Sequence, residues 1–239
     1  MTEDVARLVR EIRRLSGGIT SLVVDFRSQV SLQLMPIQAY GRIHFLSPDK
    51  FRSETMVNGK KIITIRSGTS VHRYLPSKME VWKYDLKDLP QTEPLNLAIA
   101  DLRNPFILVD EANLEYSGIL DESGAATHAF KAPLKNWEKH GLLDTRKGFI
   151  LKYQPKGLEY RLCLLVDTKT GLLRKLTGTD KTDKQVLEAD YTIESTNIPM
   201  DESMFALNES TAPYKTVRIS EILISGLNPD AADAAPSMN

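Results

Sequence analysis

The sequence lacks several features from which a function is often inferred. Its one cysteine, Cys163, excludes a disulfide within the chain and says little about the redox compartment. No apolar run approaches the roughly 20 residues that a helix needs to cross a bilayer. Lysine plus arginine and aspartate plus glutamate each number 31, so the formal net charge is zero. That balance argues against a nucleic-acid partner, which would need a basic face.

Catalytic and metal-binding motifs are also missing. None of the four histidines is at H-x-x-x-H spacing, and Cys163 has no CxxC partner. The segment from Asp167 to Gly171 lacks the alternating acids and the distal glutamate of a calcium loop. The sequence contains no GxSxG, P-loop or GxGxxG motif. We therefore expect no catalytic residues, no metal and no cofactor, and a protein that is not an enzyme.

The N-terminus carries acids early and no apolar h-region, so no signal peptide is visible. Two explanations stay open: the protein is cytoplasmic, or a leader precedes the sequence as given. Residues 4–15 are predicted to form a helix, because Val5, Leu8, Val9 and Ile12 recur at helical spacing. Thr2 is its expected N-cap, and the glycines at 17 and 18 are expected to end it.

Residues 21–34 show the clearest pattern in the chain, an alternation of apolar and polar side chains. Alternation with a period of two predicts a long β-strand that is buried on one face. The apolar members of this face are Leu22, Val24, Phe26, Val30, Leu32 and Leu34. Most strands have only five or six residues, so this strand is expected to organise the sheet.

Further short alternating segments and turns predict a mainly β protein with one curved antiparallel sheet. The Asn58-Gly59 pair is a strong hairpin signal within a first meander of six strands. A helix is predicted over residues 95–102, and a second meander follows it. The expected strands are 21–34, 39–46, 51–57, 61–66, 70–75, 79–86, 114–120, 125–131, 158–166, 172–178 and 185–193, with one possible last element at 217–224.

The length suits one all-β domain. We predict a single domain over residues 1–207 and a C-terminal extension over 208–239. Residues 228–239, rich in Ala, Asp, Pro and Ser, are expected to be disordered.

The candidate site is an apolar surface rather than a cluster of reactive groups. Ile43 and Phe45 on the second strand would extend the apolar face of the first, and Tyr74, Trp82, Phe106, Ile107 and Leu108 would close over it. Patterning alone favours an ordinary packed core, whereas a strongly curved and partly filled sheet would leave a lipid-sized pocket. A bulge near Met35-Pro36 would invert which residues face it.

Four segments resemble the outer-membrane lipoprotein carrier (LolA) family, as a divergent relative. They are SLVVDFRSQ at 21–29, GRIHFLSPDKFR at 41–52, SGTSVHRYLP at 67–76 and LLVDTKTGL at 164–172. The resemblance implies an incomplete β-barrel with a helical lid, here residues 95–109, over an apolar cavity. Ser47 stands where the carrier has a lid-latching arginine, and His72 where a tryptophan is common.

What the resemblance implies is a periplasmic or cell-envelope carrier for lipid acyl chains or lipoprotein anchors. Its implied partners are a lipid or acylated lipoprotein, with an inner-membrane donor and an outer-membrane acceptor as further candidates. A monomer is expected, and nucleic acid is not. The alternative is an envelope interaction or stress-sensing domain of the same fold, and an enzyme that lacks acid–base motifs is a third possibility.

Overall fold

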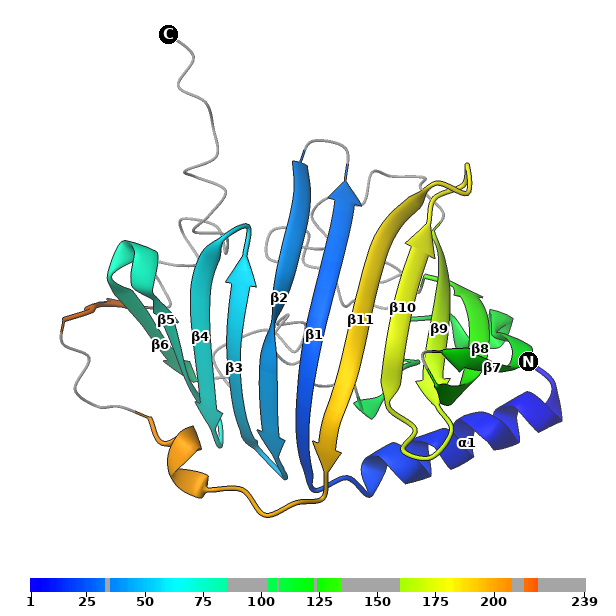
Figure 1. Ribbon diagram of the computed structural model, residues 1–239, viewed down its shortest axis with the longest axis horizontal. Coiled ribbons are helices and arrows are strands. Elements are labelled where there is room, and N and C mark those ends of the chain that lie inside the picture. The colour runs from blue at the N-terminus through cyan, green and yellow to red at the C-terminus, as the bar shows by residue number, and fades with distance from the viewer. Residues whose placement is uncertain are drawn as a thin grey trace, which may run out of the picture.

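The computed structural model describes residues 1–32, 35–85, 103–106, 108–122, 124–134, 160–207 and 213–218, and the account below concerns these residues. They form one sheet of twelve strands in the order β12-β6-β5-β4-β3-β2-β1-β11-β10-β9-β8-β7 (Figure 1). The strands are β1 (Ser21–Leu32), β2 (Met35–Leu46), β3 (Lys50–Val57), β4 (Lys60–Ser67), β5 (Ser70–Leu75), β6 (Glu80–Asp85), β7 (Glu115–Glu122), β8 (Ala125–Pro133), β9 (Arg161–Asp167), β10 (Leu173–Thr179), β11 (Gln185–Thr196) and β12 (Lys215–Arg218).

The sheet is open, with β12 at one edge and β7 at the other. Neighbouring strands pair antiparallel, except that β12 runs parallel to β6. The prediction of a mainly β protein with a curved, incomplete barrel and an N-terminal helix is confirmed. The predicted helix at 95–102, and with it most of the lid, lies outside the described residues.

The pairing of β1 with β11 joins the two meanders at the middle of the sheet. On one side of this pair lie β2 to β6, and on the other lie β10 to β7 (Figure 1). The β3–β4 hairpin turns at Asn58 and Gly59, which both have positive φ, as the Asn-Gly pair predicts. The β1–β11 register shifts between Val23 and Val24.

The junction of the first two strands differs from the prediction. The second strand was expected to begin at residue 39, after Met35-Pro36 had ended or bulged the first. Instead, β2 begins at Met35, and Pro36 pairs opposite Ser31 without a shift of register. Proline is tolerated here because it lies close to the end of the hairpin, next to the first residue of its strand.

The N-terminal helix α1 (Glu3–Gly17) forms as predicted. The Thr2 side chain accepts a hydrogen bond from the Val5 N–H, and Gly18 is the C-cap. Val9 and Ile12 are buried among side chains of β8 to β10. These and their neighbours form the helix-side cluster: Val9, Ile12, Phe106, Val109, Leu114, Phe130, Ala132, Leu162, Leu164, Val166, Leu173, Leu176 and Ala189.

The β9–β10 turn fits closely against the C-terminal half of α1. Gly171 in this turn has a φ of 68°, and a Cβ atom there would overlap the carbonyl oxygen of Ile12. Asp167 starts the turn and is only 5% exposed. It accepts hydrogen bonds from the Thr170 N–H and hydroxyl, at 2.8 and 2.9 Å, and from both Nε and Nη2 of Arg174.

We predict that Gly171→Ala destabilises the protein by about 3 kcal/mol or more, because alanine there combines a positive φ with a backbone overlap. The matched control is Gly59→Ala, since Gly59 also has positive φ but has nothing within 4 Å of an added Cβ. That control should cost about 1 kcal/mol. Urea unfolding measures both, and equal losses would contradict the close contact between this turn and α1.

Asp167 also predicts a pH dependence of stability. Burial by itself raises its pKa, but the hydrogen bonds from Thr170 and Arg174 outweigh it and hold the pKa below its ordinary value. The folded state therefore loses stability as the pH falls below about 5 and through this lowered pKa. The free energy of unfolding of Asp167→Asn should be about 2 kcal/mol lower than that of the wild type at pH 7. This difference should become smaller towards pH 2, because only the wild type loses the contribution of the carboxylate. Urea unfolding at a series of pH values measures this difference, and a difference that stays constant between pH 7 and pH 2 would contradict the prediction.

Candidate functional site

Strand pairing sorts the side chains of β1 to β6 onto two faces. Residues directly opposite each other in an antiparallel pair share a face. One such row crosses all six strands: Val24, Ile43, Ser53, Thr64, Arg73 and Trp82. We call the face that carries this row the inner face, and the opposite one the outer face.

The inner face of β1 to β6 carries a continuous set of apolar side chains, which we call the inner-face cluster. Several of its members are aromatic, and no member is more than 9% exposed. The cluster contains Ile19, Leu22, Val24, Ile43, Phe45, Phe51, Val71, Leu75, Trp82, Tyr84 and Leu172, with Phe26, Ile62, Tyr191 and Ile193 packed against it.

The two halves of the sheet differ in what the described residues place over them. The helix-side cluster includes Val9 and Ile12 of α1, so that half is a conventional helix-on-sheet core. In the described part of the chain, the inner-face cluster includes no residue of α1. The guanidinium of Arg103 does reach it and lies 4.9 Å from the centre of the Phe45 ring.

Arg103 connects the end of α1 to this face. Its Nη2 donates to the Gly17 carbonyl at 3.1 Å, and Ser16 Oγ donates to the Arg103 carbonyl at 2.6 Å. A cation at a helix C-terminus satisfies free carbonyls and the helix dipole. Burial lowers the pKa of Arg103 from its ordinary value. Sequence reasoning did not single out this residue, because a lone arginine outside any motif carries no signal.

The predicted site residues fall into three groups. Leu22, Val24, Ile43, Phe45 and Trp82 come together in the inner-face cluster, and Phe26 packs against it. Val30 lies on the same face farther along β1 and is partly buried.

Phe106 and Leu108 belong instead with the helix-side cluster. Leu32 is described by its backbone alone, as the last residue of β1. Leu34 and Ile107 lie outside the described residues.

Tyr74 is on the outer face, away from the other predicted residues. It pairs with Val81, so it points opposite to Trp82 and packs with Ile65 and Tyr214. The side chains of β5 on the inner face are Val71, Arg73 and Leu75, which the sequence interpretation passed over. Both faces of β5 carry buried residues, so its sequence has no simple alternation that would show which side is inner.

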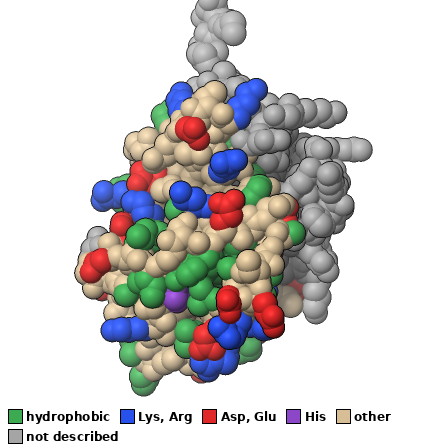
Figure 2. Space-filling view, turned by 90° about the vertical axis from the view of Figure 1, so that its right-hand side faces the viewer, with side chains coloured by type: hydrophobic (Ala, Val, Ile, Leu, Met, Phe, Trp, Pro, Cys, Tyr) green, Lys and Arg blue, Asp and Glu red, His purple; other side chains and the backbone are tan. Residues whose placement is uncertain are grey.

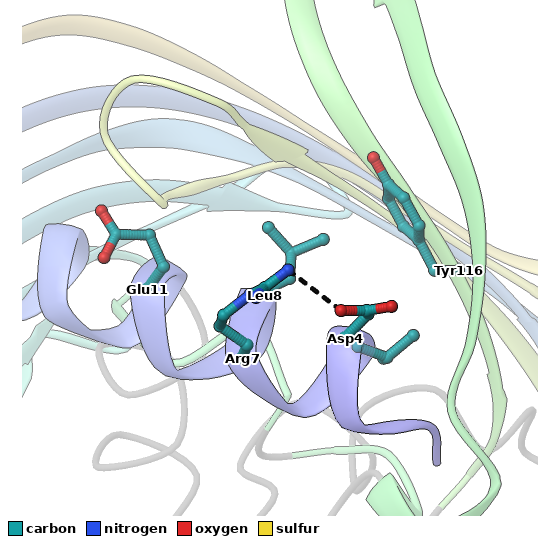
Figure 3. A pocket seen from close by; sticks show the side chains of 6 residues that line it. Asp4, Arg7, Leu8, Glu11 and Tyr116 are labelled. Carbon is teal, nitrogen blue, oxygen red and sulfur yellow. Dashed lines mark hydrogen bonds and ion pairs between the residues drawn. The ribbon is translucent and has the colours of Figure 1, made fainter.

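A groove lies between α1 and the edge strand β7 (Figure 3). It has a volume of about 460 Å³ and is lined by Asp4, Val5, Arg7, Leu8, Glu11 and Tyr116. Arg7 and Asp4 pair with each other at 2.9 Å within this groove. Figure 2 shows hydrophobic side chains gathered on the face that carries this edge of the sheet. On β7 itself, Ile119 is 60% exposed and Leu120 is 48% exposed.

The described residues offer little for chemistry. Burial raises the pKa of the Cys163 thiol, which therefore stays protonated and weakly nucleophilic at neutral pH. Burial lowers the pKa of both His44 and His128. Within the described ranges, no group of three His, Cys, Asp or Glu side chains is placed to hold a metal ion. Within the same ranges, no helix is both long and apolar enough to cross a membrane.

Comparison with known proteins gives the fold class. No family model and no curated protein matches the sequence. Solved structures with the same fold include an uncharacterized conserved protein from Thermus thermophilus, which is 10% identical with a TM-score of 0.52. The alignment covers 90% of this chain and 99% of that one.

A second such structure is the lipoprotein LppX of Mycobacterium tuberculosis. It is 12% identical with a TM-score of 0.51, over 84% of this chain and 99% of that one. At these identities the likeness shows a shared fold. Our protein therefore shares the fold of a mycobacterial lipoprotein, and membership of the LolA family stays a prediction.

Proposed function

We propose that this protein binds the acyl chains of a lipid or of a lipoprotein anchor on the inner face of β1 to β6. The observation that carries the proposal is the inner-face cluster itself. It is a continuous apolar and aromatic surface on an open sheet, and α1 covers the other half of that sheet.

The energetics of such a surface suit a reversible carrier. Each methylene removed from water contributes about 0.8 kcal/mol, so ten contribute about 8 kcal/mol. The entropy that the ligand loses on association, and on the ordering of its acyl chain, offsets several kcal/mol of that gain. The remainder corresponds to binding that is firm but reversible, as release to an acceptor requires.

In this proposal the protein works in the periplasm or cell envelope and moves its cargo from an inner-membrane donor to an outer-membrane acceptor. It acts as a monomer, without a cofactor and without catalysis. The fold shared with a lipoprotein and the resemblance of four sequence segments to a carrier family support this assignment.

A second candidate is a domain that binds a protein partner, as in an envelope interaction or stress-sensing module. The strand β7 favours it, because it is an edge strand among the described residues and carries the exposed side chains of Ile119 and Leu120. In that case the partner would bind at the β7 edge, and acyl chains would not bind to the inner face.

Trp82 provides a direct probe of acyl binding, because it lies in the inner-face cluster and is 5% exposed. In a Trp137→Phe variant, Trp82 is the remaining tryptophan. We predict that dodecanoate brominated at carbon 2 or carbon 12 quenches its fluorescence saturably, since bromine quenches only by contact.

The matched control moves the tryptophan to the outer face. In a Trp82→Phe, Trp137→Phe, Tyr74→Trp variant, the single indole replaces a side chain that points away from the inner face. Its fluorescence should remain unquenched at ligand concentrations that saturate Trp82. Equal quenching in the two variants, or no quenching of Trp82 in a protein shown to be folded by circular dichroism, would contradict the proposed function.

A further inference from the structure

The charged side chain of Arg73 lies within the apolar inner face. It is on β5 between Val71 and Leu75, which are 0% and 2% exposed. Across the sheet it is directly opposite Thr64 on β4 and Trp82 on β6. Side chains so paired have Cβ atoms about 5 Å apart, so the Arg73 side chain starts within the inner-face cluster.

The guanidinium of Arg73 is not fully satisfied by the described residues. Its Nε is buried and has no hydrogen-bond partner among them. Other arginines in comparable places are satisfied: Arg66 on the same face donates its Nε to the Gly68 carbonyl at 2.8 Å, and Arg103 donates to the Gly17 carbonyl. The contrast makes Arg73 unusual among the arginines of this face.

The acidic residue on the neighbouring strand does not neutralise Arg73. Glu80 lies on the inner face of β6, opposite Leu75, and its Oε2 accepts from Trp82 Nε1 at 3.4 Å. Among the described residues, no carboxylate forms an ion pair with Arg73. A guanidinium keeps its charge at any physiological pH, and a buried donor without an acceptor costs free energy. Such groups in a folded protein call for an explanation, and the binding of an anion by the guanidinium is one.

The neighbours of Arg73 form a short polar path into the apolar surface. Thr64 and Ser53 follow it in the row across β4 and β3, and they are 2% and 8% exposed. Beyond them the row continues with Ile43 and Val24. From β5 to β1, this row is therefore charged at Arg73, polar at Thr64 and Ser53, and apolar at Ile43 and Val24.

We propose that Arg73 binds the terminal oxyanion of the acyl ligand, a carboxylate or a phosphate, while the chain extends over the inner-face cluster. Thr64 and Ser53 supply adjoining hydroxyl donors. The guanidinium fork matches both oxyanions, because each can accept two parallel N–H bonds. This inference rests on the proposed function and adds to it the class of ligand: an amphiphile with a negatively charged end.

The test compares three probes with the same twelve-carbon chain: dodecanoate, dodecyl phosphate and dodecan-1-ol. Isothermal titration calorimetry gives the affinity of each probe for the wild-type protein, for the Arg73→Gln variant and for the Arg27→Gln variant. The last variant is the matched control, because it makes the same charge change at an exposed position of β1 whose side chain is on the outer face.

For the wild type we expect one or both anionic probes to bind about tenfold to a hundredfold more tightly than the alcohol. Arg73→Gln should remove that preference and leave the affinity for dodecan-1-ol within about threefold. Arg27→Gln should keep the preference. The tighter of the two anions identifies the headgroup as a carboxylate or a phosphate.

A measurement without ligand separates this role from a structural one. Because no described carboxylate pairs with Arg73, Arg73→Gln should unfold at the same temperature as the wild type or a higher one. A structural arginine would lower the unfolding temperature when replaced.

The contrary outcomes are distinct. If all three probes bind equally, or if Arg73→Gln keeps the preference for anions, then Arg73 is not the headgroup site, while acyl binding stands. If no probe binds the wild type, then the proposed function fails, and the headgroup site fails with it.

Discussion

The structure depends on the pairing of β1 with β11. This pair connects a meander near the N-terminus to another near the C-terminus, and it turns two small sheets into one continuous surface. Both strands span twelve residues, about twice the usual length. The length of these strands sets the extent of the sheet along the strand direction, and their alternation places Leu22, Val24 and Phe26 in one line on the inner face.

The surface created by that pairing is used differently in its two halves. On the β7 to β10 side, α1 lies against the sheet, and the close fit of the Gly171 turn to Ile12 fixes its position. On the β1 to β6 side, the face carries the inner-face cluster and also Arg73, whose buried Nε has no partner among the described residues. A core that served stability alone would gain from a neutral side chain at that place. The placement of Arg73 is therefore easier to explain by an amphiphilic ligand than by packing.

The sequence predicted much of this fold because the signals were local. The alternation in residues 21–32, the Asn58-Gly59 turn and the Thr2 cap are each determined by a few neighbouring residues, and each was predicted correctly. The strand order and the open edges also agree with the predicted curved, incomplete barrel.

The candidate site was less predictable, because it depends on which face each strand presents. Tyr74 and Trp82 are both buried aromatics on adjacent strands, yet the register places them on opposite faces. β5 and β6 are buried on both faces, so hydrophobicity does not reveal which residues are inner. For the same reason the sequence does not identify Arg73 as a site residue. Its apolar surroundings, Val71, Leu75 and Trp82, are known only once the strand pairing is known.

The most direct test of the central claim is a set of isotope-filtered NOEs between a carbon-13-labelled dodecanoate chain and the methyl groups of the protein. Acyl binding on the inner face predicts cross-peaks to Leu22, Val24 and Ile43. It predicts none to Val23 of β1 or Ile65 of β4, whose side chains lie on the outer face. Cross-peaks to the outer face or to Ile119 and Leu120 of β7, or none to the inner face at saturating ligand, would contradict it.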